Sequence, residues 1–482
     1  MIVRKISREV ASAQAKNTLI TIVKRTARAY LLGHITHTGP RLLKVILLLY
    51  QKRLGVKAAL NKTRQVVENA LAYNKFPAFC ATLFASYTLL EHIFFLVARW
   101  LVDVLLEDRI PDRRLLLRLC RIVAGLAASS WSFRLLNEQD SIADAQTPPK
   151  ADKNGNKKLS LAGRTLDFTL LIIIRAVEAL IGEGWQRYRE TNPKRRSSLR
   201  LSAEAIVANL ADPAVFMASA GIVMWAWFYT PERLPHAYQK WIGEAASVEE
   251  RLVQALRNCR NGSFVYGKQT GQAPLLQGMC QDYKWPMHWG DPAVTIPVPC
   301  EMVHMGTGRS CHYHALSRFI RAFKFSLAMY LPIQLAVKMR DPSLKAVAVS
   351  LREASRSAAF LGAFIGLFYY SVCSARTLIG PKLFSRTTVT PQMWDSGLCV
   401  GAGCAACGLS IFLEKPQRRP ELAFFVAPRA AAIFLPRRYD PKYLWREQLA
   451  FAIGAATLLA MVEENPKSAR GLVSFVLSKI LE

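Results

Sequence analysis

The sequence predicts an all-α membrane protein, a polytopic transmembrane helix bundle with small-residue helix packing and a Cys-rich loop. Half of the 482 residues are hydrophobic (51%), yet 64 Lys and Arg stand against 34 Asp and Glu, a formal net charge of +30. The basic residues lie between strongly apolar runs rather than in one tract, which is typical of membrane-helix ends that face anionic lipid headgroups. Small residues also recur at a spacing that suits close helix packing.

The strong positive charge alone would indicate a nucleic-acid partner in a soluble protein. The sequence contains no zinc-finger spacing, no RNP-like string and no basic-region heptads. We therefore expect membrane lipids, and no nucleic acid, as partners of this chain.

Residues 1–136 are assigned to basic amphipathic and membrane helices. The first 28 residues carry a single acid, Glu9, among seven basic side chains: Arg4, Lys5, Arg8, Lys16, Lys24, Arg25 and Arg28. This segment has no compact apolar core with a small-residue cleavage site, so a secretory signal peptide is not expected. A mitochondrial presequence and a helix that lies on a membrane surface both fit, and the sequence leaves the two open.

Three apolar runs approach the roughly 20 residues needed to span a bilayer. They cover residues 213–230, 357–375 and 396–413, and none contains a charged side chain. The first run closes with Trp225, Trp227 and Tyr229, and Trp394 precedes the third, as expected of interfacial aromatics.

Five further runs are shorter or interrupted by a charge or a proline. They cover residues 76–100 (with Glu91 and His92), 166–181 (with Arg175 and Glu178), 325–337, 424–435 and 449–462. Together with the three uncharged runs they predict between five and nine membrane spans.

The polar segments divide the chain. Residues 137–160 have almost no apolar content and are predicted to be a disordered linker. Residues 161–230 hold membrane helices with a basic loop around Lys194, and residues 231–317 form a Cys/His-rich loop segment. Residues 318–482 form the C-terminal helix bundle. Basic loops flank both ends of the run at 396–413, so the membrane orientation stays open.

Small residues recur every four positions in the late helices. The three sets are Ala358, Gly362 and Gly366; Gly397, Gly401 and Ala405; and Ala452, Ala456 and Ala460. This spacing lets helix backbones approach closely. Ordinary helix packing and a seam for a specific oligomer or a conduit both remain open, and so does the partner, a second copy of the chain or an organelle membrane complex.

The Cys/His-rich segment contains a candidate metal site. Cys300, His304, Cys311 and His314 follow one another with three, six and two intervening residues. Two thiols and two imidazoles could hold a structural zinc ion in a tetrahedral site, and Cys259, Cys280 and His312 are spare candidates. The spacing matches no zinc knuckle, and a disulfide between Cys300 and Cys311, or plain packing, explains the same residues.

Signals of catalysis or of a bound organic cofactor are absent from the sequence. It contains no GxSxG elbow, no phosphate-binding loop, no dinucleotide fingerprint and no HExxH string. Glu91 and His92 form an ionisable pair within an apolar run, which marks a functional hypothesis. We nevertheless expect a protein that is not an enzyme, with no catalytic or cofactor-binding residues.

Several strings in this sequence resemble the transmembrane protein 135 family. They are PCEMVH (299–304), SC (310–311), SLAMYLP (326–332), SAAFLGAF (357–364) and RRPELAFFVAPRA (418–430). Nearer the start, AYLLG (29–33) and TGPR (38–41) resemble the first helix of fungal members. The resemblance covers most of the chain and is strongest from about residue 295 onward.

The resemblance implies a location and a class of function. Members of that family are associated with peroxisomes, mitochondria and lipid droplets, with lipid handling and organelle dynamics, and with no established enzymatic activity. The family is distantly similar to channel subunits of the mitochondrial inner-membrane translocases, so residues 318–482 are expected to form a translocase-like bundle. The implied function is support of lipid or sterol transport and organelle homeostasis in a peroxisomal or mitochondrial membrane; the alternative is a translocase-like channel component for protein import.

Overall fold

The computed structural model of this chain describes residues 2–52, 54–105, 113–137, 162–191, 198–338, 343–466 and 470–482. Within these residues the chain is built from helices and contains no β-strand; one antiparallel bridge joins Ala162 and Tyr439. The prediction of an all-α fold is confirmed. Apart from Asn137, the predicted linker at 137–160 lies outside the described residues, and so do the basic residues Lys194 to Arg196.

The helices form two compact units. One comprises Met1–Arg195 together with Arg437–Glu482, and the other comprises Arg196–Pro436. The predicted C-terminal bundle at 318–482 is therefore shared between the two units. We call them the terminal unit and the central unit.

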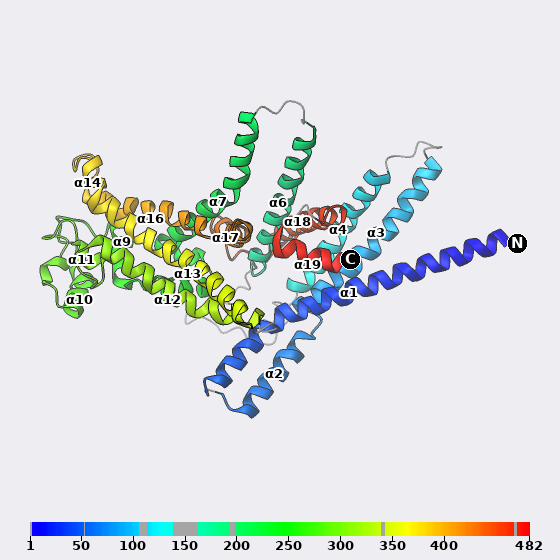
Figure 1. Cartoon of the computed structure of the whole chain (residues 1–482), viewed down its shortest axis with the longest axis horizontal. Helices are drawn as coiled ribbons and strands as arrows, with labels where there is room; N and C mark the ends of the chain where they lie inside the picture. The colour runs from blue at the N-terminus through cyan, green and yellow to red at the C-terminus, as the bar shows by residue number, and fades with distance from the viewer. Residues whose placement is uncertain are drawn as a thin grey trace. The chain divides into compact units, whose positions relative to one another are not determined.

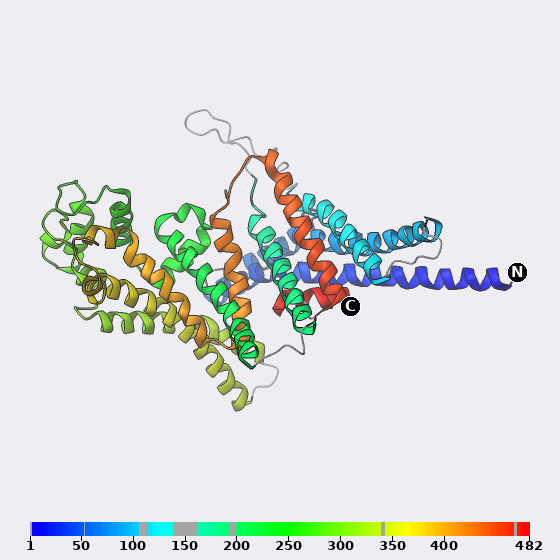
Figure 2. The same ribbon diagram turned by 90° about the horizontal axis from the view of Figure 1, so that it is seen from above.

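The terminal unit is organised around α18 (Leu444–Glu464). This helix packs against α4 (Arg113–Asn137) and α6 (Leu166–Thr191), while α3 (Phe76–Leu105) packs against α4 and α1 (Ile2–Tyr50). The remaining helices, α2 (Val56–Ala70) and α19 (Gly471–Leu481), contact α1, and α19 also contacts α18. In Figure 2, α1 is the long helix that begins at the end of the chain marked N.

A cluster of phenylalanine rings holds α18 in place. The ring of Phe451 lies 4.9 Å from that of Phe133, 5.5 Å from Phe168 and 6.0 Å from Phe79. These rings come from α18, α4, α6 and α3, so one aromatic cluster joins four helices. Aromatic pairs at such distances add to the hydrophobic stabilisation of a core.

The central unit contains a long helical hairpin, α12 (Cys311–Lys338) and α13 (Leu344–Cys373), whose members lie side by side in Figure 1. Beside it, α7 (Ser198–Tyr229) packs against α16 (Cys399–Cys407) and α17 (Arg419–Ile433), and α13 packs against α16. A π-helical turn, η4 (Ser374–Leu378), and the short helix α14 (Gly380–Leu383) continue α13. A second π-helical turn, η5 (Trp394–Leu398), follows the short helix α15 (Pro391–Met393) and leads into α16. Two 3-10 turns, η6 (Gly408–Leu413) and η7 (Pro416–Arg418), then connect α16 to α17.

Residues 231–317 fold as short helices around their own buried side chains. The helices are η2 (Pro231–Arg233), α8 (His236–Ala246), α9 (Glu250–Asn261), α10 (Ala273–Tyr283), η3 (Met287–Gly290) and α11 (Cys300–Val303). Phe264, Leu276, Met279, Cys280 and Met302 are each no more than 1% exposed. They belong to one buried cluster with side chains of α7, α13, α16 and α17, so this segment shares the core of the central unit even though its composition is polar.

Five helical segments among the described residues are long and apolar enough to cross a membrane. They are Phe76–Val102, Arg113–Asn137, Glu204–Tyr229, Leu344–Leu383 and Pro391–Leu413, and by this length and composition the chain is a membrane protein. The three uncharged runs and the run at 76–100 fall within four of them, which agrees with the predicted minimum of five spans. The other four predicted runs lie in α6, α12, α17 and α18, which are helical but do not meet the same criterion.

Candidate metal centre

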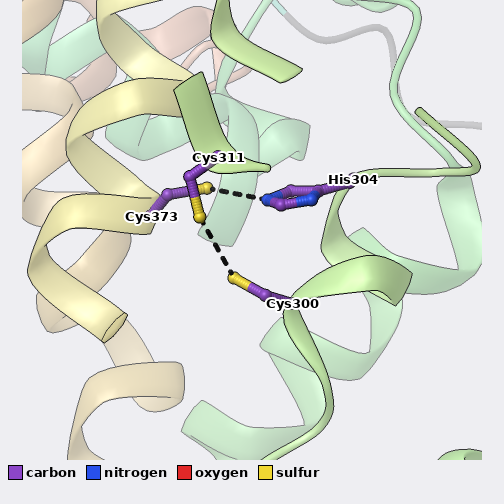
Figure 3. Close-up of side chains that lie close together, drawn as sticks. All are labelled: Cys300, His304, Cys311 and Cys373. Carbon is purple, nitrogen blue, oxygen red and sulfur yellow. Dashed lines mark hydrogen bonds between the residues drawn. The ribbon is translucent and has the colours of Figure 1, made fainter. Parts of the chain in front are cut away.

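Four ligand-type side chains from three parts of the central unit meet at one end of the α12–α13 hairpin. Cys300 begins α11, His304 directly follows α11, Cys311 begins α12 and Cys373 ends α13. One ligand atom from each residue can be chosen so that all four lie within 4.8 Å of one another. Figure 3 shows the side chains converging on a common centre.

The local fold explains how the first three residues come together. Cys300 and His304 are four residues apart, so their side chains lie on the same face of a helical turn. Met305, Gly306 and Gly308 then adopt positive φ angles of 51°, 82° and 100°, which turn the chain toward the start of α12. Two of these three positions are glycine, the residue that adopts such angles at least cost.

The distances within the group are short. The Sγ atoms of Cys300 and Cys311 are 3.8 Å apart, and His304 Nε2 lies 3.6 Å from the Sγ atom of Cys373. The hydroxyl of Thr377 lies 3.8 Å from Cys300 Sγ and 3.9 Å from Cys311 Sγ. His304 and Cys373 are buried, whereas Cys300 is partly exposed.

The surroundings shift the protonation equilibria of the group. Hydrogen bonds from Cys373 and His304 outweigh burial and hold the pKa of the Cys300 thiol well below its ordinary value. Burial and the neighbouring Cys300 thiolate raise the pKa of the Cys311 thiol. Burial alone would lower the pKa of His304, but its contact with Cys300 and its hydrogen bond to the Gly308 carbonyl raise it.

His314, which the sequence suggested as the fourth ligand, is not part of this group. Its ring stacks on that of His304 with the centroids 4.6 Å apart, and its Nδ1 lies 2.7 Å from the Thr307 hydroxyl. Burial, together with the nearby His304 and Arg318, lowers the pKa of His314 to about 3. The fourth position of the group is taken by Cys373 instead.

The spare candidates also lie elsewhere. His312 is exposed, with its ring 5.5 Å from that of Tyr370, and Cys259 and Cys280 are buried outside the group. All ten cysteines are free thiols, including Cys300 and Cys311. The spacing of residues in the sequence does not reveal Cys373 as a ligand, because this residue lies inside an apolar run and far from the other ligands in the chain.

The glycines expected at helix contacts fall into two groups. A Cβ atom at Gly362 would lie 3.0 Å from the Phe319 carbonyl oxygen, and one at Gly366 would lie 3.2 Å from the Phe319 Cβ, so both glycines face α12. At Gly401 the nearest atom would be a Trp225 ring carbon at 3.7 Å, an ordinary contact. Gly397 has a φ of 157° and a ψ of −28°, which interrupts the helix before α16.

The ionisable pair at Glu91 and His92 divides in the structure. His92 is exposed, whereas Glu91 accepts a hydrogen bond of 2.8 Å from Arg121 on α4. Glu463 of α18 joins the same network, since it binds Arg25 at 2.8 Å and the Tyr87 hydroxyl at 2.6 Å. We call Arg25, Tyr87, Glu91, Arg121 and Glu463 the ionic network of the terminal unit.

The central unit also contains an apolar cavity of about 160 Å³. Residues of α7, α8, α12, α13 and α17 line it, and nearly all of them are apolar or aromatic; they include Phe216, Met224, Trp241, Ile242, Phe360 and Phe425. Such a lining favours small apolar groups over polar ones.

Comparison with known proteins finds no match for this chain. No family model matches the sequence, and neither the curated proteins nor the solved structures give a match. The candidate functions therefore depend on the geometry of the two sites and on the sequence strings quoted above.

Proposed function

We propose that this chain is a non-enzymatic integral membrane protein of peroxisomes or mitochondria that supports lipid or sterol movement. The observation that carries the proposal is the apolar cavity of the central unit, which lies among helices that include two candidate membrane spans, α7 and α13. The resemblance to the transmembrane protein 135 family supports the organelle and the lipid class of the ligand.

The lining of the cavity favours a hydrocarbon ligand over a polar one. Transfer of apolar groups from water into an apolar environment is favourable, whereas a polar group without a hydrogen-bond partner loses free energy there. At about 160 Å³, the cavity would hold part of an alkyl chain or one edge of a sterol ring system rather than a whole lipid. The remainder of such a ligand would extend into the surrounding bilayer.

Photo-crosslinking tests this proposal. The full-length protein in vesicles is exposed to a diazirine-labelled fatty acid or sterol, and the crosslinked peptides are identified by mass spectrometry. We expect labelling of α7 and α13, and at least a fivefold reduction in Ala220→Phe, because Ala220 lines the cavity and is 4% exposed.

The matched control is Ala405→Phe, since Ala405 is exposed on α16 and does not line the cavity. Equal labelling of both variants would contradict lipid binding in the cavity. Fluorescently tagged protein found only in the plasma membrane or the cytosol would contradict the proposed location. Stable co-purification with protein-import subunits, together with an import defect on depletion, would favour the translocase-like alternative.

A further inference from the structure

We infer that Cys300, His304, Cys311 and Cys373 form a closed zinc site that fastens α11 to the end of the α12–α13 hairpin. Cys373, and not His314, supplies the fourth ligand. This inference is independent of the proposed lipid function, because none of the four residues lines the apolar cavity.

The distances between the ligand atoms fit a tetrahedral zinc ion. With Zn–S bonds of about 2.3 Å and Zn–N bonds of about 2.0 Å, two sulfurs are about 3.8 Å apart and a sulfur and a nitrogen about 3.5 Å apart. The observed separations are 3.8 Å for Cys300 and Cys311 and 3.6 Å for Cys373 and His304. The four atoms lie around one point, as Figure 3 shows, and small adjustments would equalise the longer separations of up to 4.8 Å.

The hydrogen bonding of His304 orients it as a metal ligand. Its Nδ1 lies 2.7 Å from the Gly308 carbonyl oxygen, and because a carbonyl can only accept, Nδ1 carries the proton. Nε2 is then unprotonated in the neutral ring and faces Cys373. A zinc-bound histidine usually donates its other ring N–H to a carbonyl or carboxylate in this way.

The donor set selects the metal and its role. Three thiolates and one imidazole are soft ligands that favour zinc over magnesium or calcium. Four protein ligands complete a tetrahedral shell and leave no position for water or substrate, which is the arrangement of a structural rather than a catalytic zinc site.

The position of the site explains what zinc would stabilise. Residues 304–310 join α11 to α12 through a turn, and Cys373 lies on a different helix, so one ion would fix this turn to α13. The four ligands are not assembled in an unfolded chain, and metal binding therefore contributes directly to folding stability.

Elemental analysis of the full-length protein tests the inference. The protein is purified in detergent under reducing conditions without a chelator, and zinc is measured by mass spectrometry. We expect one zinc per chain in the wild type, less than a tenth of that in Cys373→Ser, and an unchanged content in His314→Gln. The matched control is His312→Ala, because His312 is exposed and adjacent to Cys311, and this variant should retain its zinc.

A spectroscopic experiment on the wild type does not depend on the folding of variants. Replacement of zinc by cobalt should give a thiolate-to-cobalt charge-transfer band and the visible bands of a tetrahedral site. The inference is wrong if the wild type contains no metal and takes up neither zinc nor cobalt, or if it contains a Cys300–Cys311 disulfide. Loss of zinc from His314→Gln with retention in Cys373→Ser would overturn the ligand assignment.

Discussion

Among the ion pairs of the described residues in the central unit, the pair of Arg376 and Asp395 is the most deeply buried. Both side chains are 4% exposed, and two hydrogen bonds of 2.5 and 2.8 Å join the guanidinium to the carboxylate. The hydroxyl of Tyr266 donates a third hydrogen bond of 2.5 Å to Asp395. The pair therefore joins the two π-helical turns η4 and η5 to the segment that follows α9.

Removal of one partner of this pair should be strongly destabilising. In Arg376→Leu the buried carboxylate of Asp395 loses its counter-charge, and we expect a loss of about 3 to 5 kcal/mol in the free energy of unfolding. The measurement is thermal unfolding of the purified full-length protein. The double variant Arg376→Leu with Asp395→Leu should recover part of the loss, because no unpaired charge remains. An unchanged melting temperature in Arg376→Leu would contradict this account.

For single residues, the sequence predicts metal ligands that lie close together along the chain but does not predict those that lie far apart. Cys300, His304 and Cys311 could be proposed from their spacing, because a helical turn and a short loop bring them together. Cys373 could not, since only the antiparallel hairpin places it beside Cys311. His314 follows Cys311 closely in the sequence, but its ring stacks on the back of His304 instead.

Among the elements, the contact between α12 and α13 depends on small residues. Gly362 and Gly366 lie against Phe319 and allow the two helices to approach closely. Gly401 belongs to a similar sequence pattern but has more room around it. The same spacing of small residues therefore occurs at a tight contact and at a loose one, and the spacing alone does not distinguish them.

Leucine at position 362 should separate the hairpin. A Cβ atom there would already lie 3.0 Å from the Phe319 carbonyl oxygen, so we expect Gly362→Leu to cost about 2 kcal/mol or more. The matched control, Gly401→Leu, should cost less than half of that. Thermal unfolding and cross-linking between α12 and α13 would measure the effect; equal losses in both variants would contradict the difference in packing.

The ionic network of the terminal unit supports a second prediction about elements. Glu463 pairs with Arg25 and binds Tyr87, so its removal takes this acceptor from the partly buried Arg25 guanidinium and from the buried Tyr87 hydroxyl. We expect Glu463→Ala to cost about 3 kcal/mol. Lys479→Ala, which breaks the exposed pair with Glu482, should leave the melting temperature unchanged. Similar melting temperatures for the two variants would show that the network contributes nothing.

Ion pairs between helices also explain why the sequence did not reveal α4 as a candidate span. The first half of α4 carries Arg118 and Arg121, which interrupt its apolar pattern. In the structure Arg118 pairs with Glu183 and Glu464, and Arg121 with Glu91. Partners on other helices satisfy these charges, and no local pattern in the sequence encodes such partners.

For the molecule as a whole, the hairpin restricts how the chain can cross a membrane. Cys311 begins α12 and Cys373 ends α13, yet the two thiols belong to one cluster. If α13 crosses the bilayer, α12 must therefore cross beside it in the opposite direction. Protein groups satisfy a charge on α12, because Arg318 donates to the Ser247 carbonyl at 2.9 Å and lies 5.2 Å from the Tyr369 ring centre.

Protease accessibility in sealed vesicles checks this topology. Recognition sites inserted at Gly308 and at Arg386, both exposed, should be cleaved from the same side of the membrane. Both insertions lie near the end of the hairpin that carries the cysteines. The Gly308 carbonyl accepts a hydrogen bond from His304, and Arg386 lines one cavity with Thr377, whose hydroxyl lies beside the cysteines. Detergent should make both sites accessible as a control. Cleavage from opposite sides would show that the α12–α13 hairpin is not preserved in the membrane.

The aromatic cluster around Phe451 has a consequence for the order of synthesis. Phe79, Phe133 and Phe168 leave the ribosome early, but α18, which carries Phe451, follows only after the whole central unit has been made. Until then the faces of α4 and α6 that receive α18 have no partner, a state in which helices are prone to misassembly and depend on chaperones. A chain that stops at residue 436 would contain the whole central unit but would lack α18, so the apolar faces of α4 and α6 would stay exposed.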